Sequence, residues 1–423
     1  MAEPIRSSSE TNWAGNYRYQ ARRLHRPTSV GELQEIIAHA DTVRVLGSRH
    51  SFTDITDSGE LITLAAMPPD VSVDRDAGTV SFSAGLTYGA LAEVLNDEGL
   101  ALHNLASLPH ISVAGAVATA THGSGDRNGN LATAVASLEM VTSSGEMVSA
   151  SRGDADFDGM VIGLGALGAV IRLTLDVEPA YDARQRVFEG LDWKMLFDHF
   201  DEIMSSGYSV SVFTRWGPAV DMVWIKSRVT AVPESVRDDL YGAAASTVDR
   251  NPILGMDPAN ASPQLGRPGP WSERLPHFRM GFTPSTGDEI QSEYLLPRAH
   301  AVAAIDAVRG LAERLRPLLL VTEIRTVASD QLWMSPQYGH HTVGLHFTWR
   351  PEQAAVEDVL IDLESALAPF SARPHWGKLF LANAEEIAPL YERLPDFVRL
   401  VEKIDPRSAF RNAWLDARVL GSA

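Results

Sequence analysis

Helical and extended periodicities alternate along the first half of the chain. Residues 29–40 and 88–100 carry apolar side chains at helical spacing. Ser29 begins the first segment and Thr87 precedes the second, and either hydroxyl can cap a helix. A short apolar run at 43–46 and an alternating run at 79–84 are typical of strands. The chain therefore begins with small units of helix and strand.

The next segment predicts a hairpin and a half-buried strand. Residues 135–150 read as two strands around a turn at 143–145, and residues 171–177 alternate strictly between apolar and polar. Pro179 then marks a boundary, after which the chain is a mixture of strands and helices to about residue 370. At roughly 100–200 residues per domain, the length is sufficient for two or three domains.

Composition narrows the class of protein. With 423 residues, 45% hydrophobic and 21% charged, the chain is typical of a globular protein. Its net charge of −18 argues against a nucleic-acid partner, and no apolar run is long enough for a membrane span. The absence of cysteine excludes thiol catalysis and disulfides. Only four of the 36 basic residues are lysines, so a lysine beside candidate site residues is of interest.

Two loops of the first half could bind anionic groups. Gly47 to Ser51 follow a strand and place His50 among small polar residues, where successive amides can form a nest for phosphate. Residues 104–125 are almost entirely small, which lets backbone lie against an extended ligand. Simple turns would explain either loop alone. Two such loops in one domain favour a large phosphate-bearing cofactor.

A polar constellation lies on two downstream strands. Glu323 and Arg325 are two residues apart, as are His346 and Thr348, so each pair shares one face of its strand. Side by side, they would offer a carboxylate, a guanidinium, an imidazole and a hydroxyl to a substrate with several hydroxyls. A solvent-exposed polar sheet face is the alternative.

Lys378 and the nearby histidines raise two further possibilities. Lys378, between a glycine and an apolar segment, could stabilise an oxyanion or lie on the surface. His340, His341 and His346 fit no standard zinc spacing, so no metal is expected.

Together these motifs resemble the vanillyl-alcohol-oxidase-type flavoproteins, and within them the sugar-alcohol and aldonolactone oxidases. The segments that carry the resemblance are NWAGN at 12–16, LGSRHSF at 46–52, ASLPHISVAGAVATATHGSG at 106–125, GALGAV at 165–170, EIR at 323–325, HWGK at 375–378 and DPRSAFRN at 405–412. They span nearly the whole chain.

The resemblance implies an FAD covalently attached through His50. A neutral imidazole can attack the electrophilic 8α-carbon of the flavin. The residues implied to bind the cofactor are Leu46, Gly47, Ser48, Arg49, His50, Ser51, Ser107, Ser112, Gly115, Ala116, Val117, Ala118, Thr119, His122, Gly123, Val170, Ile171 and His375.

The resemblance also implies a polyol substrate and dioxygen as partners. The expected reaction oxidises the terminal CH2OH of an alditol such as xylitol or sorbitol to the aldose, with hydride transfer to flavin N5 and release of hydrogen peroxide. The residues implied to bind substrate are Ser107, Glu323, Arg325, His346, Thr348 and Lys378. Of these, Arg325, Lys378, His346 and Glu323 are implied to be catalytic, with either His346 or Lys378 as proton acceptor. Oxidation of an aldonolactone by an oxidase or dehydrogenase is the alternative.

By the same resemblance, the fold class would be α+β in two domains, and residues 1–179 would form a PCMH-type FAD-binding domain. Residues 180–374 would form a substrate-binding cap with a mixed or antiparallel sheet, and residues 375–423 would return to the FAD domain. A cytoplasmic, monomeric bacterial enzyme is expected.

Overall fold

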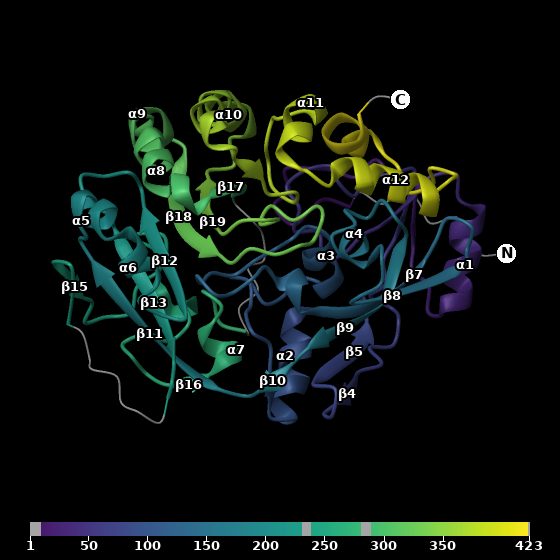
Figure 1. Ribbon diagram of the computed structural model, residues 1–423, viewed down its shortest axis with the longest axis horizontal. Helices are drawn as coiled ribbons and strands as arrows, with labels where there is room; N and C mark the ends of the chain where they lie inside the picture. Colours follow the sequence, from purple (N-terminus) through teal and green to yellow (C-terminus); the bar gives the residue numbers. More distant parts are fainter. Residues whose placement is uncertain (1–9, 231–237, 281–288, 422–423) are drawn as a thin grey trace.

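The computed structural model describes residues 10–230, 238–280 and 289–421, which form two lobes, each built on a large sheet (Figure 1). One sheet has five strands in the order β4–β5–β9–β7–β8. The other has ten, in the order β14–β15–β11–β13–β12–β18–β19–β17–β20 with β16 beside β11. Helices flank both sheets, so the predicted α+β class is confirmed.

The strands have the following bounds: β1 Arg23–His25, β2 Val43–Val45, β3 Glu60–Ile62, β4 Ser72–Asp74, β5 Thr79–Ser83, β6 Leu100–Ala101, β7 Val135–Val141, β8 Met147–Ser151, β9 Ala169–Asp176, β10 Glu178–Pro179, β11 Asp182–Glu189, β12 Ser209–Thr214, β13 Met222–Arg228, β14 Asp239–Leu240, β15 Ala243–Ala245, β16 Gly269–Pro270, β17 Ile290–Pro297, β18 Leu319–Val327, β19 Thr342–Trp349 and β20 Arg373–Pro374. The helices are α1 Val30–His39, α2 Tyr88–Asp97, α3 Val113–Ala118, α4 Phe157–Val161, α5 Trp193–Asp198, α6 Phe200–Met204, α7 Trp271–Arg274, α8 Ala301–Arg309, α9 Ala312–Leu315, α10 Gln353–Leu367, α11 Ala384–Ile387, α12 Leu394–Ile404 and α13 Ala413–Leu415.

The local signals of the first half are confirmed. Ser29 and Thr87 cap α1 and α2, each accepting a hydrogen bond from a backbone amide of the first turn. The predicted hairpin is β7 and β8, and β9 alternates between buried and half-buried residues along its length. A small parallel sheet has the order β1–β3–β2, and the Gly47 loop follows directly after its strand β2.

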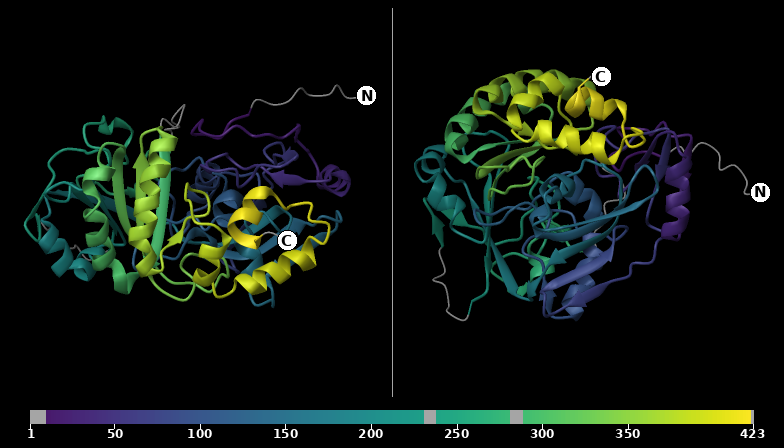
Figure 2. Two further views of the ribbon diagram at one scale, coloured as in Figure 1. Left: turned by 90° about the horizontal axis from the view of Figure 1, so that it is seen from above. Right: turned by 45° about the vertical axis from the view of Figure 1, so that its right-hand side comes forward.

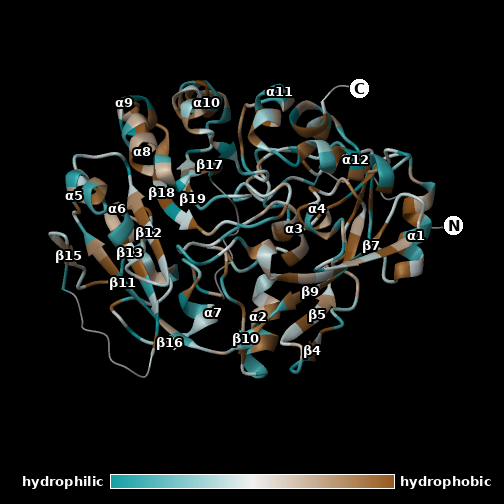
Figure 3. Ribbon diagram, in the orientation of Figure 1, coloured by the Kyte–Doolittle hydropathy of each residue, from teal (hydrophilic) through white to brown (hydrophobic). Residues whose placement is uncertain are grey.

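The central strands β12, β18 and β19 of the ten-stranded sheet are buried on both faces. On β18 and β19, one set of alternating residues, including Ile324, Phe347 and Trp349, joins a core with residues of the flanking helices α8 and α10. Figure 3 shows both hydrophobic and hydrophilic residues on these two strands. The other set contains Glu323 and His346, which are 4% and 8% exposed. The alternative of a solvent-exposed polar face is therefore wrong.

The end of the chain packs against its beginning. β20 pairs with β17 at the edge of the ten-stranded sheet, and the C-terminal helices then lie over the N-terminal lobe (Figure 2). The Val43 amide donates to the Ala409 carbonyl, and the buried Arg44 guanidinium donates to the carbonyl of Phe410. These contacts account for the packed DPRSAFRN segment. The domain boundaries at 179/180 and 374/375 stay predictions.

Among the described residues, no helix has both the length and the apolar character that a bilayer span requires. The cytoplasmic location and the monomeric state stay predictions from the sequence.

Candidate active site

A cavity of about 750 Å³ lies between the two sheets. Its walls come from the loops after β2 and before α3 on one side, and from β17, β18 and β19 on the other. This size is in the upper range for ligand and cofactor sites. The residues that line it include most of those predicted from the sequence: Leu46, Gly47, Ser48, Arg49, His50, Ser51, Ser107, Ser112, Gly115, Ala116, Ala118, Thr119, His122, Val170, Glu323, Arg325, His346, Thr348, His375 and Lys378.

The His50 loop is built to leave room for a ligand. A Cβ on either Gly47 or Gly115 would approach Ser112 Oγ to about 2.5 or 2.6 Å, so a side chain at either position would displace the Ser112 hydroxyl from this loop. The amides of Gly47, Arg49, His50 and Ser51 have no hydrogen-bond acceptor among the described residues, which fits a site for phosphate oxygens. The non-glycine Arg49 has a φ of +66°, a strained conformation that turns the chain at this point.

His50 is half-buried and neutral at ordinary pH. Burial and the neighbouring His110 lower the pKa of His50 to about 3. Its Nδ1 lies 3.0 Å from Ser48 Oγ, while its buried Nε2 has no hydrogen-bond partner among the described residues. Trp13 stacks on the ring at 5.2 Å. A neutral imidazole with an unused nitrogen fits the chemistry of covalent flavin attachment.

The N-terminal NWAGN motif braces this loop. Asn12 Nδ2 donates to the Ser51 carbonyl, and Asn16 Nδ2 donates to the Phe52 carbonyl. The Phe52 amide in turn donates to the carbonyl of Gly377 in HWGK. Three motifs that are distant in sequence thus form one structure around His50.

Strand pairing brings the polar constellation together. β18 and β19 are antiparallel neighbours, and Glu323 lies directly opposite His346. Gly344 lies opposite Arg325, and with no side chain there, the guanidinium extends across β19 toward β17. The prediction that the two polar pairs lie on one face of neighbouring strands is confirmed.

Glu293, which the sequence analysis missed, lies at the centre of the site. It lies on β17 opposite His346 and accepts hydrogen bonds from Arg325 Nη2 at 2.7 Å and from Lys378 Nζ at 2.6 Å. His122 Nε2 lies 3.2 Å from Glu293 Oε1. Burial alone would raise the pKa of Glu293, but Lys378, Arg325 and His122 outweigh it and hold the pKa well below its usual range. The side chain is therefore a buried anion that joins two cations.

Lys378 and His346 form a hydrogen-bonded pair at the cavity wall. Lys378 Nζ lies 2.5 Å from His346 Nδ1, and His346 Nε2 lies 3.1 Å from Thr348 Oγ1. Burial and the Lys378 charge lower the pKa of His346 to about 4, and burial lowers the pKa of Lys378. Both shifts favour the neutral form, so the pair has the capacity to take up a proton.

On the opposite side of the constellation, His277 contacts Glu323. His277 Nε2 lies 2.8 Å from Glu323 Oε1, and burial lowers the pKa of His277. Burial would raise the pKa of Glu323, but Arg325 and His277 lower it below its ordinary value, so Glu323 is a carboxylate. His277 comes from the loop after α7, where no periodicity marked it. Other lining residues that the sequence analysis did not name are Trp13, Asn251, Asp257, Asn260, Glu289 and Gln291.

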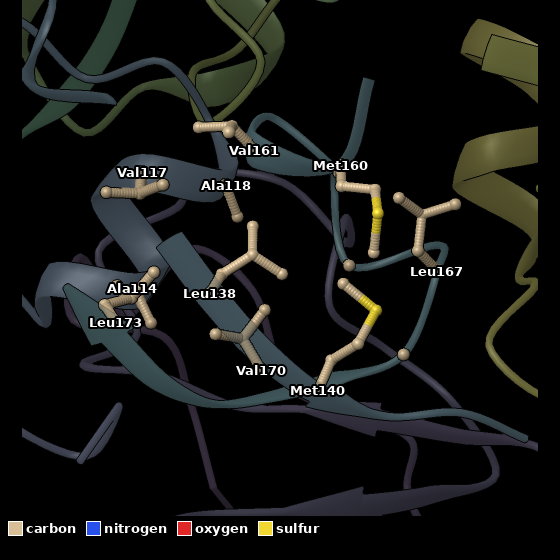
Figure 4. A pocket seen from close by; sticks show the side chains of 13 residues that line it. Ala114, Val117, Ala118, Leu138, Met140, Met160, Val161, Leu167, Val170 and Leu173 are labelled. Carbon is tan, nitrogen blue, oxygen red and sulfur yellow. The ribbon is translucent and has the colours of Figure 1, made fainter. Parts of the chain in front are cut away.

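Three predicted cofactor residues do not line the main cavity. Ile171 follows Val170 on β9 and so points to the opposite face, into a separate apolar core. A Cβ at Gly123 would meet Asn104, so that glycine packs behind the cavity wall. Val117 borders a second cavity of about 40 Å³, lined only by apolar side chains and glycines (Figure 4). That small cavity offers no polar group for catalysis.

The chain matches two family models. Residues 21–151 match the FAD binding domain, and residues 286–418 match D-arabinono-1,4-lactone oxidase. The first match contains the His50 loop and the small-residue segment. The second contains β18, β19 and the HWGK segment.

Curated relatives match over nearly their whole length. The chain is 46% identical to alditol oxidase of a Streptomyces strain, covering 97% of this chain and 98% of that protein. It is 29% identical to L-gulono-1,4-lactone dehydrogenase of Mycobacterium tuberculosis, covering 97% and 99%. It is 25% identical to L-gulonolactone oxidase of Mus musculus, covering 96% and 97%.

Among solved structures, cholesterol oxidase from B. sterolicum superposes with a TM-score of 0.79 at 14% identity. That match covers 97% of this chain and 96% of the other. At this identity the likeness concerns the fold alone.

Proposed function

The chain belongs to the family of alditol oxidase, within the vanillyl-alcohol-oxidase-type flavoproteins, and we propose that it oxidises the terminal CH2OH of alditols such as xylitol and sorbitol to the aldose. The observation that carries this proposal is the row of alternating charges beside the cavity: Glu323, Arg325, Glu293 and Lys378. Such a row offers acceptors and donors in turn to the hydroxyls of an open-chain polyol.

The proposed cofactor is FAD, attached covalently through His50. This assignment is supported by the Nε2 of His50 and the loop amides, which have no partner within the part of the chain that the structure describes, and by the glycines packed on Ser112. When bound, FAD supplies the hydride acceptor and passes the electrons to dioxygen, giving hydrogen peroxide.

The residues of the chain would bind the polyol and manage its charge. Glu323 would accept hydrogen bonds from hydroxyls through Oε2, which has no hydrogen-bond partner among the described residues. Ser107 and Thr348 also line the cavity and would contact further hydroxyls. The buried Arg325 Nε is without a hydrogen-bond partner among the described residues, so it is available to the reacting oxygen.

Lys378 and His346 would act on the hydroxyl proton as one unit. If the ammonium of Lys378 donates to Nδ1 of His346, then Nε2 carries the ring hydrogen and points to Thr348. The neutral ring keeps one lone pair, on Nδ1, and this lone pair can take up the hydroxyl proton when the hydrogen bond from Lys378 is released; a neutral Lys378 can serve equally. The proton acceptor is therefore the pair, because the two groups titrate together.

We expect the pH profile of kcat/KM for xylitol to report this pair. His346 must be neutral for the pair to accept a proton, and its pKa is lowered to about 4. Activity should therefore persist as pH falls through the ordinary imidazole value of about 6.5 and decline only toward pH 4. Steady-state assays from pH 4 to 8 test this; an acid limb at about 6.5 would contradict the assignment.

A His50→Ala variant should lose all covalently bound flavin. The remaining loop amides still offer a phosphate site, so some FAD should bind reversibly. Flavin fluorescence on a denaturing gel tests the bond, with His39→Ala, an exposed histidine at the end of α1, as the matched control. Fluorescence that stays with the His50→Ala polypeptide would contradict the linkage.

The experiment that tests the substrate class is anaerobic mixing of the purified flavoprotein with xylitol, sorbitol or L-gulono-1,4-lactone. We expect rapid bleaching of flavin absorbance by the two polyols and slow bleaching by the lactone. The reverse order would keep the flavin assignment and replace the polyol by an aldonolactone.

A further inference from the structure

A second lysine–histidine pair lies beneath Glu323. Lys226 on β13 is 1% exposed, and His277 comes from the loop after α7, which lies between the ten-stranded sheet and α2 (Figure 1). Lys226 Nζ lies 3.2 Å from His277 Nδ1, and it also donates to the carbonyls of Leu275 and Pro276. Three donor hydrogens thus meet three acceptors, the complete coordination of an ammonium group.

The contact with Glu323 determines which ring nitrogen of His277 carries hydrogen. The carboxylate can only accept, so Nε2 of the neutral ring carries the hydrogen and Nδ1 accepts from Lys226. The ring hydrogen is then on Nε2, where it is donated to Glu323 Oε1 at 2.8 Å. Phe213 and Trp224 meet the ring edge-on at 5.5 and 5.6 Å and prevent it from turning. Lys226, His277 and Glu323 therefore form a directed chain of hydrogen bonds.

This chain determines where the charge of Glu323 lies. Arg325 Nε is 3.6 Å from Glu323 Oε1, just beyond hydrogen-bond distance, and the Nε is unpartnered among the described residues. Without the hydrogen bond from His277, the carboxylate could close onto this guanidinium as a bidentate pair, the arrangement that these two groups prefer. That closure would use the two groups that the cavity otherwise presents to a ligand.

We infer that His277 and Lys226 are positioning residues for the polyol: they hold Glu323 Oε1 so that Oε2 and Arg325 Nε stay available to substrate hydroxyls. The inference rests on the proposed function and extends it to His277 in the cavity wall and to Lys226 behind it. The charged and titratable groups that take part in these hydrogen bonds or adjoin them include Lys226, His277, Glu323 and Arg325. Burial lowers the pKa of Lys226 to about 7.

Steady-state kinetics of variants in the flavinylated enzyme test the inference. His277→Leu should raise the KM for xylitol by about 10–100-fold, which corresponds to the free energy of one hydrogen bond to a charged group. It should change kcat by less than about threefold. His277→Gln keeps an amide donor for Glu323 and should recover most of the affinity. Lys226→Met removes the donor to Nδ1 and should raise KM in the same direction, which decides the matter if His277→Leu does not fold.

A double-mutant cycle separates positioning from general packing. In a Glu323→Gln background, the further change His277→Leu should raise KM by less than about twofold, because residues that act through one another are not additive. The full increase in both backgrounds, or an unchanged KM in His277→Leu and Lys226→Met, would overturn the inference.

Xylitol binding gives a readout that does not depend on turnover. The xylitol concentration that half-saturates the rise in unfolding temperature of the anaerobically reduced enzyme should increase in parallel with KM. An unchanged concentration in the variants would overturn the inference alone. Failure of the wild-type enzyme to bind or oxidise xylitol would overturn the proposed function and the inference with it.

Discussion

Replacing Glu293 by glutamine is expected to cost about 3–5 kcal/mol of folding free energy, because a buried ion pair that loses one partner leaves the other uncompensated. Arg325 and Lys378 both donate to this carboxylate, whose side chain is fully buried. Activity should fall together with stability, since the two cations would repel each other and leave their positions. Chemical denaturation and steady-state kinetics measure the two effects.

The acid side of the stability profile distinguishes this account from a packing effect. The pKa of Glu293 is lower in the folded state than its ordinary value of 4.5, so its contribution to stability is present above that pH and is lost as pH falls. The glutamine variant should therefore lose less stability than wild type between pH 5 and pH 3. Glu313→Gln, at a surface pair with Arg316, is the matched control and should change stability by less than about 0.5 kcal/mol. A Glu293→Gln protein as stable as the control would contradict the assigned role.

Replacing Lys378 by methionine is expected to lower kcat for xylitol by about 10²–10³-fold, the usual loss when a donor to a developing oxyanion is removed. Lys378 is 2.6 Å from Glu293 and pairs with His346, so its loss removes both a cation and half of the proton-accepting unit. The flavin should stay attached, because His50 is untouched.

The matched control is Lys194→Met, at an exposed lysine of α5 that pairs only with Asp198 among the described residues. It should keep full activity. In Lys378→Met the residual acid limb should move up from about pH 4, because the Lys378 charge is one cause of the lowered pKa of His346. Unchanged turnover in Lys378→Met would remove this residue from the mechanism.

Local signals in the sequence predicted much of the first lobe. The caps at Ser29 and Thr87, the hairpin of β7 and β8 and the alternation of β9 depend on residues close in sequence. Boundaries were less predictable. Residues 300–315 have the apolar spacing of one helix in the sequence, but they form two helices, α8 and α9, interrupted near Gly310.

Strand periodicity predicted the four residues of the polar constellation but not Glu293, which lies among them. Residues two apart share a face, so Glu323 with Arg325 and His346 with Thr348 followed directly. Glu293 was missed because its role depends on the pairing of β17 with β19, a contact between distant segments. The available signal was that Gln291 and Glu293, two residues apart, share one face of a strand that continues as the apolar run at 294–297.

Lys226 and His277 show a different limit. A lysine within the apolar strand MVWIKSR could have been recognised as a buried cation, since lysine is almost never fully buried without partners. His277 lies in a loop, where no periodicity indicates its direction. The NWAGN segment contributed only to the resemblance, and its hydrogen bonds to the His50 loop supply the physical reason for its presence.

The measurement that tests the central claim most directly is the balance of products when the flavoprotein oxidises xylitol in air. We expect one hydrogen peroxide and one aldose for each xylitol consumed, with L-gulono-1,4-lactone giving far less peroxide under the same conditions. A yellow protein that releases no peroxide from xylitol, or that favours the lactone, would contradict the account.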